Sequence, residues 1–144
     1  MIVLLQRVCE AQVKVSGQCI AGIDQGILAL VGVQADDNEG TAEQFFTRII
    51  NYRIFSDSQG KMNLSLVEIK GGLLLVPQFT LAANTNKGRR PSFTSAAAPK
   101  LGESVFQSMI GIARSRHAKV EFGQFGANMA VHLINDGPVT FILD

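Results

Sequence analysis

The sequence predicts a single α+β domain in which a mixed β-sheet carries two outer helices. Its 144 residues fit one domain of ordinary size, and a content of 47% hydrophobic and 17% charged residues is that of a folded globule. Residues 26–33 form a continuous apolar run of strand length, which is typical of a strand covered on both faces. Two later stretches repeat apolar residues at helical spacing, so two helices are expected to provide cover.

The N-terminal third is expected to be rich in strands and to end in the first helix. Residues 2–8, 11–15 and 19–23 have strand composition, and Ser-Gly-Gln at residues 16–18 supplies turn chemistry. The helix should begin near Asp36 or Asp37, whose carboxylates can cap free amide groups. Its apolar stripe consists of Ala42, Phe45, Phe46, Ile49 and Ile50.

A central strand and a second helix follow a predicted turn at residues 56–60. The strand restarts after Gly71 and Gly72 and reaches Pro77, which has no N–H, so the strand should be irregular there or lie at an edge. The second helix should begin around Pro99, a residue favoured at the first helical position. The side chains expected to point inward from it are those of Leu101, Val105, Met109 and Ile112.

The end of the second helix and the C-terminal segment have simple structural explanations. Arg114, Arg116 and His117 lie in its last turn, where cations favourably meet the helix dipole. Residues 129–133 and 139–143 should be two strands joined by a tight turn at Asn-Asp-Gly-Pro. His132 lies in this alternating pattern, which is more typical of a core or interface residue than of a general base.

Several classes of function lack support in the sequence. Cys9 and Cys19 are too few and too close for a disulfide framework, and no Cys-x-x-Cys or histidine cluster offers a zinc site, so a reducing, cytoplasmic location is expected. The N-terminal apolar run is too short for a signal peptide or a membrane span. P-loop, Rossmann and Gly-x-Ser-x-Gly motifs are absent, and we expect neither a cofactor nor a metal. A net charge of +1 requires that any polyanion meet a local basic patch.

One stretch suggests such a patch. The central strand runs directly into Gln78, Phe79 and Thr80, and the loop that follows carries three cations, Lys87, Arg89 and Arg90. An amide, an aromatic ring and a hydroxyl followed by three cations are typical of a site for an anionic ligand. The simpler alternative is that Phe79 belongs to the core and that the cations lie on a solvated loop.

Short motifs spread over nearly the whole chain resemble the D-aminoacyl-tRNA deacylase (D-tyrosyl-tRNA deacylase) family. They are QRV at 6–8, YRIFSD at 52–57, KMN at 61–63, QFTLAA at 78–83, NKGRRPSF at 86–93 and NDGPVTF at 135–141. The resemblance implies one domain, residues 1–144, that hydrolyses the ester between a D-amino acid and the terminal adenosine of tRNA. It implies that glycine is poorly excluded. We expect the mixed sheet to be strongly curved and partly barrel-like.

The resemblance also implies roles for individual residues. Gln78, Phe79 and Thr80 would form the catalytic strand end, and Phe125 and Met129 would line the substrate pocket, although either of these two could equally be plain core. Gly137 and Pro138 would form a cis pair that enters the active site of the other subunit of a homodimer and rejects L-amino acids sterically. The residues expected to bind tRNA are Arg7, Lys87, Arg89 and Arg90.

Two points of mechanism stay open at the level of sequence. Thr80 is a candidate nucleophile, yet no adjacent base is visible to activate it, so we favour hydrolysis assisted by the 2′-hydroxyl of the substrate. The family usually has Ser before Gln-Phe-Thr, and Pro77 stands here, so no role of that hydroxyl is carried over. The competing interpretations are a non-catalytic RNA-binding module, which would lack the usual RRM and KH motifs, and a β-barrel that binds a small molecule.

Overall fold

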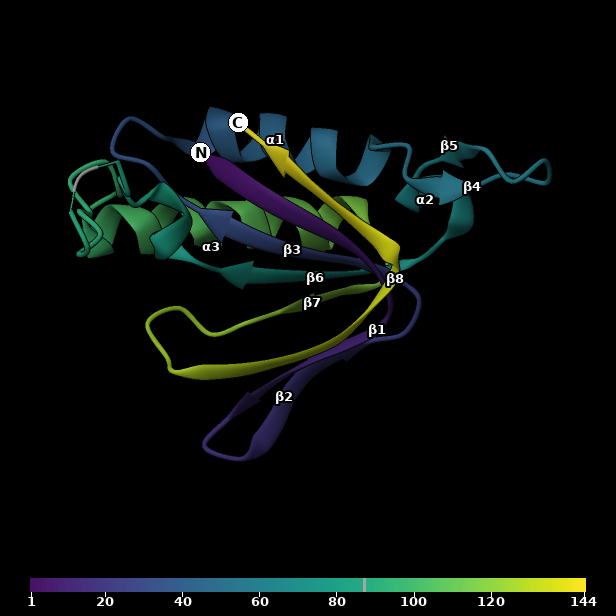
Figure 1. The fold of residues 1–144 in the computed structure, drawn as a ribbon, viewed down its shortest axis with the longest axis horizontal. Helices are drawn as coiled ribbons and strands as arrows, with labels where there is room; N and C mark the ends of the chain where they lie inside the picture. The colour runs from purple at the N-terminus through teal and green to yellow at the C-terminus, as the bar shows by residue number, and fades with distance from the viewer. Residues whose placement is uncertain (87) are drawn as a thin grey trace.

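A six-stranded mixed sheet, bent into a nearly closed barrel, forms the body of the protein in a computed structural model that describes residues 1–86 and 88–144 (Figure 1). The predicted curved sheet is confirmed. In chain order the elements are β1 (Ile2–Val15), β2 (Gln18–Ile23), β3 (Gly26–Gly32), α1 (Glu39–Asn51), β4 (Phe55–Ser56), β5 (Met62–Leu64), α2 (Leu66–Ile69), β6 (Gly72–Pro77), the 3₁₀ helix η1 (Phe79–Ala82), α3 (Pro99–Arg116), β7 (Val120–Phe122) and β8 (Met129–Leu143).

Strand β1 organises the sheet because it pairs with three other strands. Its first half pairs antiparallel with β3, its second half with β2, and β8 runs antiparallel along both halves. Beyond β3 the sheet continues through β6 and β7 in parallel. The prediction of separate strands at residues 2–8 and 11–15 is wrong, since the chain bends there without leaving the sheet. The pairing with β8 shifts register at this bend.

The C-terminal segment is likewise one long strand, so the predicted tight turn at residues 135–138 is wrong. Val8 faces Asn135 and Gln6 faces Thr140, which means that a two-residue step in β1 spans a five-residue step in β8. Pro138 lacks an N–H donor and Gly137 has a φ of +136°, so both leave the ladder while the flanking residues stay paired with β1. The extra residues form a bulge.

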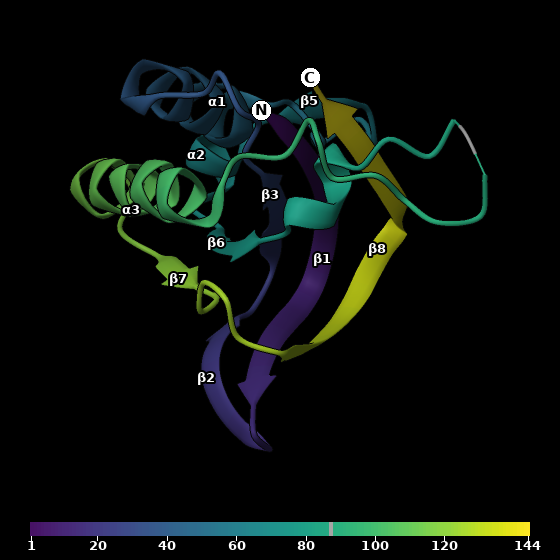
Figure 2. The ribbon, with the colours of Figure 1, turned by 90° about the vertical axis from the view of Figure 1, so that its left-hand side faces the viewer.

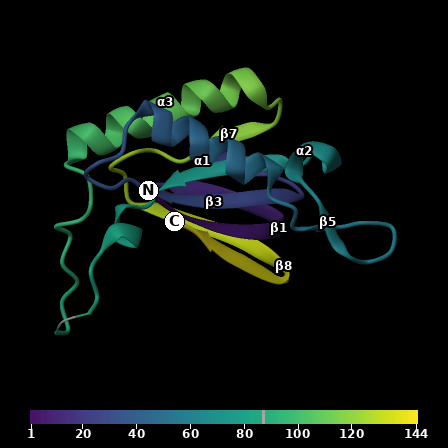
Figure 3. The same cartoon turned by 90° about the horizontal axis from the view of Figure 1, so that it is seen from above.

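Two hydrophobic cores lie on opposite faces of the sheet. Val3 and Leu5 of β1 belong to the core beneath the helices, whereas Ala11 and Val13 belong to a smaller core inside the barrel. Odd-numbered residues therefore change face between the two halves of β1, at the bend opposite the β8 bulge. The run at residues 26–33 behaves as predicted, with β3 buried against both cores. Figures 2 and 3 show α1 and α3 together on one side of the sheet.

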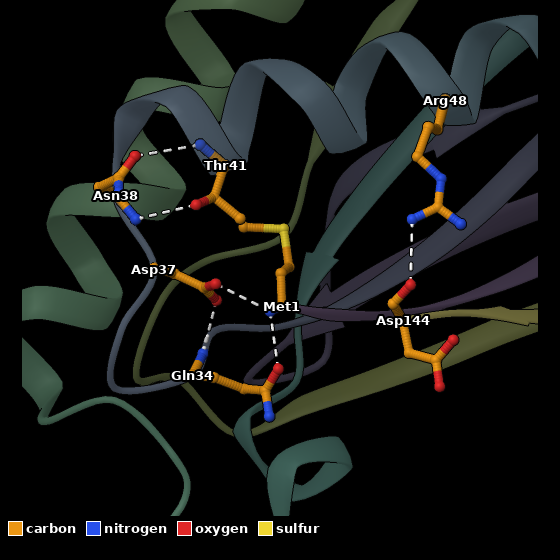
Figure 4. A network of polar contacts seen from close by, with 7 residues as sticks. All are labelled: Met1, Gln34, Asp37, Asn38, Thr41, Arg48 and Asp144. Atoms are coloured by element: carbon orange, nitrogen blue, oxygen red, sulfur yellow. Dashed lines mark hydrogen bonds and ion pairs between the residues drawn. The ribbon is translucent and has the colours of Figure 1, made fainter.

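Helix α1 begins two residues later than its predicted start. Asn38 caps it by accepting from the Thr41 amide in a capping box, because Asp37 is engaged elsewhere. The Asp37 carboxylate binds the Met1 amino group at 2.8 Å and accepts from the Gln34 amide at 2.7 Å (Figure 4). The predicted apolar stripe of α1 is fully buried. These contacts fix residues 34–37 at the end of the sheet, where the loop before α3 is anchored.

Helix α3 begins at Pro99 as predicted, but its buried face is partly different. Val105 and Met109 are buried, Ile112 is half-buried, and Leu101 is 37% exposed, so its placement in the core is wrong. Its neighbour Gly102 faces inward instead, one position round the helix. The cations of the last turn make internal contacts, and His117 Nε2 bonds the Gly71 carbonyl at 2.8 Å.

The short helix α2 was not predicted. Ser65 and Glu68 form its capping box, which spans too few residues to give a helical periodicity. In the part of the chain that the structure describes, no helix is long and apolar enough to cross a membrane.

Candidate active site

The end of strand β6 positions the predicted catalytic residues. The Gln78 amide donates to the Val31 carbonyl at 2.7 Å and fixes the chain after Pro77 against β3. Pro77 pairs with Val31 of β3. On its other side it lies past the end of β7, whose last partner in β6 is Leu75. Its missing N–H therefore costs no sheet hydrogen bond, which explains how the strand accepts proline at this position.

Helix η1 turns the chain sharply after Gln78 and leaves two amides at its start. Its first internal hydrogen bond runs from the Leu81 amide to the Gln78 carbonyl, so the Phe79 and Thr80 amides precede the bonded part of the turn. The Gln78 side-chain amide donates to the Thr80 hydroxyl. Thr80 is exposed, and this is its one side-chain hydrogen bond among the described residues.

A pocket of about 430 Å³ opens beside this turn. It contains four of the predicted site residues, namely Gln78 between β6 and η1, Phe79 at the start of η1, Phe125 in the segment before β8, and Met129 at the start of β8. The other lining residues are Val31, Val33, Val76, Pro77, Ala97, Pro99, Gly102, Gly126, Ala127, Asn128 and Val131. Among the described residues, none of the side chains that line this pocket is titratable. The pocket is mostly apolar, with the side-chain amides of Gln78 and Asn128 as its polar groups.

Phe125 and Met129 connect the pocket wall to the two cores. The ring centroid of Phe125 lies 6.4 Å from that of Phe106 in the helix-side core, and Met129 packs against the barrel core. A Cβ on Gly102 would lie 3.3 Å from the Phe125 ring, so a glycine in α3 allows this ring its position. Sequence analysis did not predict Gly102 in the site, since a glycine within a helix carries no side chain to indicate a role.

The predicted Gly137-Pro138 pair is cis and lies at the β8 bulge. The described residues that line the pocket do not include Gly137 or Pro138. Gln78 is bonded to Val31, which pairs with Val3, whereas the bulge lies beside Arg7, which pairs with Ile27. The four residues from Val3 to Arg7 span about 13 Å of strand. The two halves of the predicted site therefore lie at opposite ends of the same strand pair.

Arg7 holds the bulge. Its Nε donates to the Asp136 carbonyl at 3.0 Å and pairs with the Asp136 carboxylate at 3.1 Å, and its Nη1 donates to the Ile54 carbonyl at 2.7 Å. The side chain is only 12% exposed, so it faces the protein more than solvent. The contact with Asp136 could not be predicted from the sequence, because the two residues lie 129 positions apart, and the expected role of Arg7 in tRNA binding stays a prediction.

The β4–β5 hairpin supports the Ile54 end of this clamp. At its tip the Lys61 amide donates to Asp57 at 3.0 Å and lowers the pKa of that carboxyl below its ordinary value. In α2, the Ser65 amide similarly lowers the pKa of Glu68. Both carboxylates stabilise local turns and lie outside the pocket.

The basic loop between η1 and α3 projects away from both helices (Figure 2). Asn84 and Ser92 form a β-bridge that closes its stem, and Arg89 and Arg90 are exposed beyond this bridge. Lys87 lies outside the described residues. Phe79 is 58% exposed, so the alternative that it belongs to the core is wrong.

Comparison with solved structures defines the class of protein to which this fold and site belong. A structure titled "Structural Analysis of a probable eukaryotic D-amino acid tRNA deacylase" matches with a TM-score of 0.85 over 99% of this chain and 97% of that one, and its 18% identity shows the shared fold alone. A structure titled "c-Myc DNA Unwinding Element Binding Protein" matches with a TM-score of 0.93 and 35% identity, over 100% of this chain and 98% of that one. The fold is that of the deacylases.

Sequence comparisons then place the chain within that class. The family model described as D-Tyr-tRNA(Tyr) deacylase matches residues 4–144. A D-aminoacyl-tRNA deacylase of Ectopseudomonas mendocina (strain ymp) is 55% identical over 144 residues, which cover 100% of this chain and 99% of the relative. One of Pseudomonas paraeruginosa is 55% identical over 141 residues, covering 98% of this chain and 97% of the relative. The chain belongs to the D-Tyr-tRNA(Tyr) deacylase family, and the predicted family and enzyme class are confirmed.

Proposed function

We propose that this deacylase hydrolyses the ester of D-aminoacyl-tRNA in the pocket beside Gln78. The observation that carries the proposal is an apolar pocket, free of titratable side chains among the described residues. Its lining includes Gln78 and Phe79 at the start of η1, where the amides of Phe79 and Thr80 precede the first hydrogen bond of the turn. An ester carbonyl seated there would accept from these amides or from Gln78 as negative charge develops on its oxygen. The apolar walls would hold the terminal adenosine and exclude water other than the attacking molecule.

The RNA would supply the proton transfer that the pocket does not. The oxygen of a water molecule bonds to the ester carbon, the bond from that carbon to the ribose 3′-oxygen breaks, and the proton of the water passes to the 3′-oxygen. The neighbouring 2′-hydroxyl is the group placed to relay this proton. Thr80 accepts a hydrogen bond from Gln78, and no described residue offers a base hydrogen-bonded to its hydroxyl, which argues for a positioning role and against a nucleophile.

The Gly137-Pro138 pair would complete this site from a second subunit. In one subunit the pair lies beside Arg7 and the pocket lies near Val3, about four residues or roughly 13 Å away along β1. The pair would therefore reach a pocket only across a homodimer interface. Exposed apolar side chains of β8 suit that interface, since Ile134 and Ile142 are 54% and 64% exposed on the strand that carries the pair. The contacts of Arg7 with the bulge make it a positioning residue for the pair, acting on tRNA only through it.

Selectivity in this arrangement rests on chirality. Carbonyls of the inserted pair would hold the substrate amino group, and the pair itself would block the side chain of an L-amino acid while a D side chain points away. Glycine has no side chain to block, so glycyl-tRNA would also be hydrolysed. Charged tRNA is a cytoplasmic substrate, and we place the enzyme in that compartment.

Hydrolysis of D-tyrosyl-tRNA and L-tyrosyl-tRNA tests the proposed function directly. We expect turnover of the D ester and a preference near 10⁴-fold over the L ester, which corresponds to about 5.5 kcal/mol in the transition state. A pocket contact with one methylene supplies only about 1–3 kcal/mol, so a steric block is required. Loss of radiolabelled amino acid from the tRNA is the measurement. Binding without turnover would instead favour an RNA-binding module.

The basic loop should provide salt-dependent affinity for tRNA. Replacing Lys87, Arg89 and Arg90 with alanine is expected to make the negative slope of log K against log salt shallower by about two to three units. Each phosphate contact that is lost removes the counterion release that accompanies it. The preference for the D ester should persist. Binding measured over a salt series provides the slope, and alanine at the exposed Lys61 and Lys119 is the charge-removal control. An unaltered slope in the triple variant would mean that the loop is only solvated.

A further inference from the structure

An exposed pair of aromatic rings lies at the rim of the pocket. The ring centroids of Phe79 and Phe93 are 5.1 Å apart with an interplanar angle of 54°, and the residues are 58% and 41% exposed. Phe79 also lines the pocket, whereas Phe93 does not. The pair therefore extends an aromatic surface from the pocket wall outward to the base of the loop that carries Arg89 and Arg90.

The backbone around Phe93 is held in place, so its exposure is built into the fold. On one side Ser92 forms the β-bridge with Asn84, with hydrogen bonds of 2.7 and 3.0 Å. On the other side the Ser95 hydroxyl donates to the Ala82 carbonyl at 2.8 Å, which ties the loop to η1. Ala96 bridges to Gln34, whose side chain and amide belong to the network of Figure 4.

We propose that the Phe79–Phe93 pair is a stacking subsite for the unpaired nucleotide that precedes the terminal adenosine of the tRNA. This inference rests on the proposed function, in which the pocket holds the terminal aminoacyl-nucleoside. The next base emerges at the rim, where an aromatic face stacks any base without reading its sequence. The adjacent Arg89 and Arg90 meet the phosphates of the same strand. Exposed aromatic rings beside cations are the usual composition of a single-strand binding surface.

The charge of the loop selects the occupant of this surface. A second copy of the chain would place an apolar or mixed-charge surface there, and two exposed arginines a few residues before Phe93 in the chain favour a polyanion. Continuity with the pocket points the same way, because Phe79 belongs to both. The subsite would make the enzyme recognise the single-stranded end of its substrate, which all tRNAs share, and leave the amino acid to the pocket.

A fluorescent base at the penultimate position tests stacking without any turnover. The probe is tRNA that carries 2-aminopurine before the terminal adenosine and D-tyrosine in a non-hydrolysable amide linkage. Stacking on a ring quenches 2-aminopurine, so the wild-type protein should dim it, Phe93→Ala and Phe93→Leu should leave it bright, and Phe93→Tyr should restore the quenching. Ile20→Ala, which removes a residue that is also 41% exposed, is the control and should behave as wild type.

Kinetics supply a second readout. D-tyrosyl-adenosine lacks the preceding nucleotide, so its KM should be higher than that of D-tyrosyl-tRNA. The ratio of the two KM values should fall about tenfold in Phe93→Ala. Equal quenching by the wild type and Phe93→Ala would overturn the inference. So would a change of oligomeric state in Phe93→Ala, measured by sedimentation, because the rings would then belong to a subunit contact. Quenching that depends on Phe93 in a protein without hydrolytic activity would retain the subsite and reject the proposed function.

Discussion

D-tyrosyl-tRNA that ends in 2′-deoxyadenosine is expected to be hydrolysed at least about 10²-fold more slowly than the normal substrate. General acid–base catalysis contributes about 10²–10⁴-fold, and none of the described residues that line the pocket has a titratable side chain to replace the lost hydroxyl. Thr80→Val should retain most of the activity. Its hydroxyl accepts one uncharged hydrogen bond from Gln78, and such a bond is worth about 0.5–1.5 kcal/mol, or roughly 2–10-fold in rate. Single-turnover rates of both combinations are the measurement.

The control for this experiment separates binding from chemistry. The deoxy substrate in its non-hydrolysable form should bind the protein as tightly as the ribose form, so that the slower rate belongs to the chemical step. The opposite pair of results, an inactive Thr80→Val variant and full turnover of the deoxy substrate, would make Thr80 the nucleophile.

Mixing two inactive variants is expected to restore about a quarter of wild-type activity, if each pocket of a symmetric dimer is completed by its partner. The first variant is Gly137→Ala, in which the new Cβ would lie 2.6 Å from Val139 Cγ2 at a φ of +136° and displace the bulge. The second is Ala127→Trp, whose ring would fill the pocket. Displacement by about 1 Å is enough to cost about 10²-fold in rate, so each variant alone should be inactive.

The recovery follows from which subunit supplies which part. In a mixed dimer one pocket has neither substitution and the other has both. A chain carrying both substitutions, mixed with an equal amount of wild-type chain, is the matched control, because both pockets of that mixed dimer are damaged. Its activity should fall during exchange from about a half to about a quarter of the all-wild-type value, as only wild-type homodimers stay active, whereas the mixture of single variants should rise from none to about a quarter. Native mass spectrometry shows whether chains have exchanged. If exchange is complete and the two single variants stay inactive, each pocket is built within one subunit.

Local patterns in the sequence were sufficient to predict most helices and strands, but not the cap of α1 or the bulge in β8. The stripe of α1 and the start of α3 at Pro99 were predicted, since helical periodicity and first-turn proline are properties of neighbouring residues. The sequence predicts Asp36 or Asp37 as the cap of α1, because the contact of Asp37 with the Met1 amine, across 36 residues, has no local signal. The sequence predicts a turn at Gly137 for a similar reason, since only the partner strand β1 shows that both flanks stay in one ladder.

The site was predicted in its parts rather than in its assembly. The resemblance pointed to Gln78, Phe79, Phe125 and Met129, and the fold brings all four to one pocket. The expected tRNA-binding role of Arg7 stays a prediction, and its contacts with Asp136 at the bulge could not be predicted, because they join residues 129 positions apart. Phe93 was not singled out, since its meeting with Phe79 depends on the loop between them closing at Asn84 and Ser92.

The pairing of β1 with β8 has a consequence for synthesis of the protein. Val3 pairs with Leu143, so one edge of β1 stays uncovered until β8 has been synthesised. During translation the nascent chain carries an apolar strand with unsatisfied backbone groups, a feature that promotes aggregation of incomplete chains. Pairing of β1 with β8 therefore follows synthesis of the elements between them, and its rate is governed by contacts distant in sequence. Chaperones that bind extended segments would protect β1 during that interval.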